Sequence, residues 1–123
     1  MAWAHDAGCD VSVDRMGNIF ARRPGRDDSL PPIVTGSHLD TQPHGGKFDG
    51  VYGVLAGLEV IRSLNDHGVE TEAPIEVTVW TNEEGSRFAP SMVASGVFGG
   101  KFDLDDALAI KDADGKSIGA ELA

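Results

Sequence analysis

The stretch from Val51 to Leu64 limits what this chain can fold into, because its apolar residues take a helical spacing. They recur every three or four positions, as the buried face of an amphipathic helix requires. These residues are Val51, Val54, Leu55, Leu58, Ile61 and Leu64. Short apolar runs lie on both sides, at residues 33–35, which are fit for a buried strand, and at residues 75–79, which alternate as a strand does. A helix between strands predicts an α/β fold.

Other elements are predicted before and after this helix. Residues 9–13 and 18–21 are strand-like and flank a turn at Gly17, which predicts an N-terminal β-hairpin. Gly68 lies where a C-cap ends the helix, and Asp49 lies where an N-cap begins it. The remaining predicted elements are the end of a helix at residues 1–8, short helices at residues 91–97 and 104–110, and an acidic tail.

Composition and charge exclude several classes of protein. The 123 residues allow one domain at most, and 20 acidic against 10 basic residues give a net charge of −10. Because nucleic acids and anionic membranes are bound by clustered Lys and Arg, neither is an expected partner. The single cysteine, Cys9, cannot form an internal disulfide, and the first residues do not form a signal peptide. The expected location is therefore the cytoplasm.

Side chains that can bind a metal ion follow the predicted strands and precede the predicted helix. His38 and Asp40 come directly after the first apolar run, Asp49 precedes the helix, and Glu83 and Glu84 follow the next strand. In open α/β sheets, ligands bind beyond the carboxyl ends of the strands. Imidazole and carboxylate groups form a ligand set suited to zinc, manganese or cobalt.

Each of these groups could also have a structural role that involves no metal. Residues 37–40 could be a polar strand end, Asp49 could act only as the N-cap, and Glu83 with Glu84 could be a solvated acidic turn. The capping and metal-binding roles of Asp49 are compatible, since one oxygen could serve each. Asp40 could accept a hydrogen bond from one nitrogen of His38 while the other nitrogen binds metal.

Motifs for other chemistries are missing from the sequence. The chain contains no GxxxxGK[ST], GxGxxG, GxSxG or HExxH motif. Ser37, His38 and Asp40 are the residue types of a hydrolase triad, but a triad is assembled in space from separate segments, so three nearly contiguous residues have the wrong geometry.

Three segments resemble a known family. Residues 36–41 read GSHLDT, residues 45–57 read GGKFDGVYGVLAG, and residues 82–88 read NEEGSRF. They are similar to the amidase, hydantoinase and carbamoylase family of binuclear zinc hydrolases, which belongs to a wider clan of di-zinc aminoacylases and carboxypeptidases. Members include N-carbamoyl-L-amino-acid hydrolase, allantoate amidohydrolase and β-ureidopropionase. The similarity extends through residues 94–98.

The resemblance implies a role for each residue of the group. His38 would bind one metal ion, Asp49 would bridge two ions, and Glu84 would bind the other. Glu83 would be the general base that takes a proton from a metal-bound water, and Asp40 would orient His38. The implied cofactors are two divalent ions, zinc first, with manganese, cobalt or nickel as alternatives. The implied substrate is a small molecule with a carboxylate and a ureido or amide group.

The resemblance also implies a partial protein. Family members are several times longer and are expected to form homodimers through a separate lid and dimerisation domain. Residues 1–123 would be the front portion of a zinc-peptidase-like catalytic domain, truncated at both ends, with a mixed, mostly parallel sheet flanked by helices. Two further His ligands of the family would lie outside the chain, so we expect weak metal binding and no turnover from these residues alone.

Two alternatives to this function stay open. Within the enzyme class, the chain could belong to a dipeptidase or aminoacylase of the same clan. From another class, it could be a non-catalytic remnant or binding module that keeps the scaffold without its metals.

Overall fold

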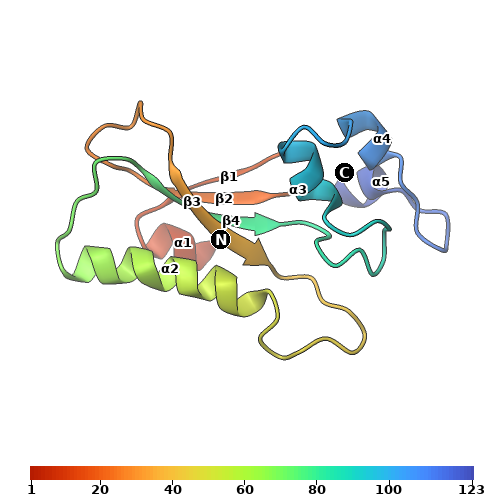
Figure 1. Ribbon diagram of the computed structural model, residues 1–123, viewed down its shortest axis with the longest axis horizontal. Coiled ribbons are helices and arrows are strands. Elements are labelled where there is room, and N and C mark those ends of the chain that lie inside the picture. The colour runs from red at the N-terminus through yellow and green to blue at the C-terminus, as the bar shows by residue number, and fades with distance from the viewer.

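The computed structural model describes residues 1–123 and combines five helices with the four strands of one sheet (Figure 1). The elements in chain order are α1 (Ala2–Asp6), β1 (Asp10–Val13), β2 (Ile19–Arg23), β3 (Ile33–His38), α2 (Val51–Asp66), β4 (Ile75–Trp80), α3 (Val93–Phe98), α4 (Leu104–Leu108) and α5 (Ile118–Leu122). The α/β class and the N-terminal hairpin are as the sequence predicts. None of the helices combines the length and apolarity needed to span a membrane.

The four strands form one mixed sheet in the order β1-β2-β4-β3. β3 and β4 are parallel, with the register running from Ile33 opposite Ile75 to His38 opposite Trp80. The β1–β2 and β2–β4 pairs are antiparallel. The expectation of mostly parallel pairing is wrong for these residues, because the hairpin pairs through β2 with β4 and so contributes two antiparallel pairs. The parallel β3–β4 pair is the part that positions the candidate site.

β3 is an edge strand and is less buried than its apolar sequence predicts. Ile33 is 66% exposed and Val34 is 48% exposed, and burial begins only at the end of the strand, at His38. The prediction of a buried strand at residues 33–35 is therefore wrong, because β3 has a neighbouring strand on one side only.

Helix α2 ends as the sequence predicts but begins differently. Gly68 has a φ of +61°, and its N–H donates to Asn65 while the N–H of Val69 donates to Leu64, which are the two hydrogen bonds of a Schellman motif. At the other end the N-cap residue is Gly50, with no side-chain cap. The N-cap prediction for Asp49 is wrong, and its carboxylate is left available to the site.

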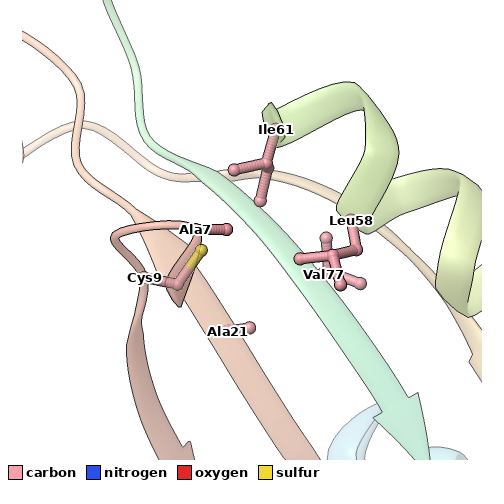
Figure 2. Packing of buried hydrophobic residues seen from close by; sticks show 6 residues of the cluster. All are labelled: Ala7, Cys9, Ala21, Leu58, Ile61 and Val77. Atoms are coloured by element: carbon pink, nitrogen blue, oxygen red, sulfur yellow. The ribbon is translucent and has the colours of Figure 1, made fainter. Parts of the chain in front are cut away.

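The main core lies between the sheet and one face of α2. Figure 2 shows Leu58 and Ile61 of α2 beside Val77 of β4, with Ala21 of β2 and the α1–β1 connection close by. Ile61 is fully buried. The opposite face of α2 is open, with Val60 50% exposed. This core fixes α2 against the sheet and thereby places the loop that carries Asp49.

A second apolar cluster joins the hairpin to the C-terminal helices, which gather beyond one end of the sheet (Figure 1). It contains Met16, Phe88, Val93, Ala94, Ala107 and Ile118. The predicted acidic tail is wrong in part, because residues 118–122 form α5 and Ile118 is buried in this cluster. Ser117 caps α5 by accepting from the N–H of Ala120.

Candidate metal centre

The metal-capable side chains predicted from the sequence come together where β3 and β4 end. His38 is the last residue of β3, Asp49 immediately precedes the N-cap of α2, and Glu83 and Glu84 follow the end of β4. Because β3 and β4 are parallel, their carboxyl ends lie at the same edge of the sheet. The packing of α2 on the sheet brings Asp49 to that edge.

One imidazole nitrogen and two carboxylates form a compact group. His38, Asp49 and Glu84 each offer a ligand atom, and these three atoms lie within 4.8 Å of one another. Nε2 of His38 is 3.8 Å from Oδ1 of Asp49 and 3.5 Å from Oε2 of Glu83. The His38 side chain is only 9% exposed, whereas that of Asp49 is 49% exposed. The imidazole of this group is therefore buried, whereas the carboxylate of Asp49 is accessible to solvent.

The two ring nitrogens of His38 face different partners. Nδ1 lies 2.9 Å from the main-chain carbonyl oxygen of Asp40. Since a carbonyl only accepts, Nδ1 is the donor in this contact; in the neutral imidazole the lone pair is then on Nε2, the nitrogen that faces Asp49 and Glu83. A neutral imidazole with this tautomer is the form that binds metal.

The Asp40 carboxylate has different hydrogen-bond partners from those that the sequence predicts. Its Oδ1 is 3.7 Å from Nδ1 of His38, which is too long for a hydrogen bond. Instead, Oδ1 accepts from the main-chain N–H of Glu83 at 3.1 Å and Oδ2 accepts from that of Glu84 at 3.0 Å. The main chain of Asp40 therefore contacts His38, and its side chain contacts the Glu83–Glu84 turn.

The same turn is held by other groups that sequence reasoning missed. Asn18 is fully buried, and its Oδ1 accepts from the N–H of Thr81 at 3.0 Å. Asn82 has a φ of +51°, and its side chain donates to the carbonyl of Phe88 at 2.7 Å. The available signal was weak, because a single Asn in a hairpin turn is typical of any turn.

The carboxylates of the group interact unfavourably with one another. Partial removal from solvent raises the pKa of Glu84, and the hydrogen-bonding contact with Asp49 and its negative charge raise that pKa further. Gln42 donates from Nε2 to Oε1 of Glu84 at 3.4 Å, but it carries no charge. Two facing carboxylates repel each other until a proton or a cation lies between them.

These observations fit a divalent cation. The donor set of one imidazole nitrogen and two carboxylate oxygens suits zinc and related ions. Nε2 of His38 faces only the carboxylates of Asp49 and Glu83, and a cation would remove the repulsion between Asp49 and Glu84. The structure therefore contains a group of residues able to hold a metal ion.

A comparison with known protein families agrees with this geometry. The sequence pattern of peptidase family M20/M25/M40 matches residues 34–121, which begin in β3 and end in α5. The chain belongs to this family. The match includes every residue of the candidate metal centre and extends through the C-terminal helices.

Within the family, the chain is similar to carbamoylases. It is 59% identical over 121 residues to an N-carbamoyl-L-amino-acid amidohydrolase of Rhizobium meliloti, covering 98% of this chain and 29% of the relative. It is 38% identical over 112 residues to a ureidoglycolate hydrolase of Arabidopsis thaliana, covering 91% of this chain and 24% of the relative. The chain thus spans less than a third of the length of these relatives.

A solved structure gives the same result for the fold. An amidase of the hydantoinase/carbamoylase family from Burkholderia multivorans superimposes with a TM-score of 0.97 at 69% identity, over 98% of this chain and 29% of that one. The resemblance expected from the sequence motifs is therefore confirmed at the level of family and fold.

Proposed function

We propose that these residues supply the front portion of the catalytic domain of a metal-dependent hydrolase that cleaves linear, non-peptide C–N amide bonds. The observation that carries the proposal is the convergence of His38, Asp49 and Glu84, with their ligand atoms within 4.8 Å of one another and the Glu83 carboxylate beside them. The proposed substrates are N-carbamoyl-L-amino acids, allantoate or related ureido acids. The names of the carbamoylase and ureidoglycolate hydrolase relatives support this class.

The proposed cofactors are two divalent ions, with zinc ranked before manganese, cobalt and nickel. His38 and Glu84 would each hold one ion, and Asp49 would be shared between them. When bound, such ions act as Lewis acids that activate water and polarise a carbonyl. The family match and the crowding of Asp49 against Glu84 support this assignment.

Glu83 is the proposed general base. Its Oε2 is 3.5 Å from Nε2 of His38, so the carboxylate lies beside the candidate ligands. In the proposed reaction, Glu83 removes a proton from water as the water oxygen forms a bond to the amide carbon. Glu83 then passes that proton to the nitrogen, which leaves as the C–N bond breaks. The proton is returned, so the carboxylate is regenerated in each cycle.

The remaining parts of the proposed enzyme lie outside these residues. We propose that a longer polypeptide supplies the other metal ligands, the groups that hold the substrate carboxylate, and a lid domain through which a homodimer forms. The 24–29% coverage of the relatives supports this division. The free, buried thiol of Cys9 supports a reducing, cytoplasmic location.

The isolated chain gives the first test of this division. Because catalytic zinc normally has three protein ligands, and the proposed bridging arrangement gives each ion only two, we expect weak zinc binding and no hydrolysis of N-carbamoyl-L-amino acids. Metal analysis after dialysis and an amine-release assay would check this. Stoichiometric binding of two ions with clear turnover would contradict it.

A chimera tests the function itself. This chain would replace the matching segment of the Rhizobium meliloti relative, and the product would be assayed on an N-carbamoyl-L-amino acid and on a dipeptide. We expect hydrolysis of the carbamoyl compound, and a fall in kcat of at least about 100-fold in Glu83→Gln with zinc content unchanged.

Other outcomes of the chimera experiment separate the alternatives. Preference for the dipeptide would favour the peptidase alternative that the family description allows. A folded chimera that binds zinc but hydrolyses neither compound would favour a non-catalytic scaffold. Normal activity of Glu83→Gln would show that another group is the base.

A further inference from the structure

We infer that the carboxylate of Asp40 is a positioning group for the Glu83–Glu84 turn, and that it holds the proposed base and the proposed ligand in register with His38. The inference deepens the proposed function and rests on it for its catalytic meaning. It differs from the expectation that the Asp40 side chain orients the imidazole.

The first observation concerns where the sheet ends. The backbone pairing of β3 with β4 stops at His38 opposite Trp80. Beyond this pair no main-chain hydrogen bond joins the two segments. The Asp40 side chain spans the gap two residues beyond His38, because its two oxygens accept the N–H groups of Glu83 and Glu84.

The second observation concerns the kind of acceptor required. The N–H groups of two consecutive residues point to the same place, at 3.1 Å and 3.0 Å from Oδ1 and Oδ2 of Asp40. A carboxylate has two equivalent oxygens that only accept, so it satisfies both donors at once. Hydrogen bonds to an ionised acceptor are also stronger than those between neutral groups. Asp40 therefore fixes the main chain from which both glutamate side chains project.

The third observation is that the main chain of Asp40 supplies the hydrogen-bond partner of His38. Nδ1 of His38 donates to the main-chain carbonyl of Asp40 at 2.9 Å, and that carbonyl is present whatever the side chain at position 40. Asp40 thus joins the two halves of the site, through its carbonyl to His38 and through its carboxylate to the glutamate turn. Its side chain is 32% exposed, so replacing it leaves no large cavity.

The experiment is nuclear magnetic resonance on the metal-free, isotope-labelled chain. A long-range HNCO spectrum detects scalar coupling across hydrogen bonds, and we expect cross-peaks from the amide nitrogens of Glu83 and Glu84 to the side-chain carboxyl carbon of Asp40. Asp103 provides an internal control, because its Oδ1 accepts from the N–H groups of Asp105 and Asp106 at 2.8 Å and 3.1 Å. Control peaks without the Asp40 peaks would overturn the inference.

Two variants test what the Asp40 side chain contributes. Asp40→Ala should speed hydrogen exchange of both the Glu83 and Glu84 amides by at least about tenfold. Asp40→Asn keeps one acceptor oxygen, so we expect one of the two amides to stay protected. The His38 ring should keep its proton on Nδ1 in both variants, as read from ring nitrogen shifts. Asp103→Ala should leave both glutamate amides unchanged.

The opposite pattern would overturn the inference. If Asp40→Ala left both amides protected while His38 changed its tautomer, the carboxylate would act on the imidazole instead. None of these readouts needs metal or substrate, so failure of the proposed hydrolase function would leave the result intact. In the chimera, Asp40→Ala should lower kcat about 10- to 100-fold, which links the position of the turn to the chemistry.

Discussion

Among single residues, Gly50 lies next to the candidate metal centre at a position that has no room for a side chain. Its φ is +71°, which residues with a side chain rarely adopt. A Cβ atom there would lie 2.5 Å from Cε1 and Nδ1 of His38. The contact explains why the residue between Asp49 and the first turn of α2 lacks a side chain. It also means that the backbone of this loop supports the imidazole.

We predict that Gly50→Ala displaces His38 and weakens zinc binding. In the chimera, zinc affinity should fall at least about tenfold, because one proposed ligand leaves its position and the backbone is strained. Competition with a chromophoric chelator would measure the change. Gly46→Ala in the same loop is the matched control, since its Cβ would meet only Asp49 Cβ at an ordinary 3.9 Å. Equal affinities in the two variants would show that the contact with His38 is unimportant.

At the scale of elements, α2 has two faces with different roles. Leu58 and Ile61 pack against β4 in the main core, whereas Val60 on the open side is 50% exposed. The buried face holds the helix on the sheet and so fixes the loop that carries Asp49. The geometry of the candidate metal centre therefore depends on the stability of this packing.

We predict that Ile61→Ala lowers the free energy of unfolding by about 2–5 kcal/mol, because it removes three carbons from a fully buried position and leaves a cavity. Val60→Ala should cost less than about 1 kcal/mol, since half of that side chain already contacts solvent. Urea unfolding followed by circular dichroism would measure both. A similar loss in the two variants would contradict the assignment of the buried face.

The spacing of apolar residues predicted the helices and strands better than it predicted their burial and their tertiary contacts. The apolar period gave α2 to within two residues, since residues 51–64 were expected and Val51–Asp66 was found. The same reasoning missed the exposure of Ile33, because an apolar run does not reveal whether its strand lies at an edge. It also missed the side-chain acceptor of the Glu83 and Glu84 amides, because that contact joins residues 43 and 44 positions apart.

At the scale of the whole molecule, Arg87 joins the segment after the glutamate turn to the C-terminal residues. Its guanidinium donates to Oδ2 of Asp112 and to Oε2 of Glu121, both at 2.9 Å. The guanidinium also lies 4.9 Å from the ring centroid of Phe88, within the second apolar cluster. Two acidic residues near the end of the chain, Asp112 and Glu121, are therefore partners of a cation, which a count of charges along the sequence could not show.

The contacts of Arg87 make stability depend on pH. Hydrogen bonding and the charge of Arg87 lower the pKa of Glu121 below 4.5. For Asp112, burial raises the pKa, but hydrogen bonds from Lys116 N–H and from Arg87 outweigh this and lower it below 3.8. A carboxyl with a lowered folded-state pKa stabilises the fold above its unfolded pKa, and this contribution is lost as the pH falls through the folded value.

We predict that Arg87→Met lowers the midpoint of thermal unfolding at neutral pH, and that its difference from the unchanged chain shrinks below pH 4.5 as the carboxyls protonate. Calorimetry between about pH 7 and pH 3 would measure this. Arg15→Met is the control, because the Arg15–Asp105 pair is 3.5 Å long and both side chains are at least 70% exposed, so little effect is expected. A difference that grew toward low pH would contradict the account.

His38, Asp49 and Glu84 are proposed to bind the same metal centre. A zinc-edge anomalous difference map from crystals of the chimera would show whether zinc lies among these three side chains. We predict anomalous peaks about 2.0–2.2 Å from a nitrogen of His38 and from carboxylate oxygens of Asp49 and Glu84. Zinc bound elsewhere, with these three side chains free of metal, would contradict the claim.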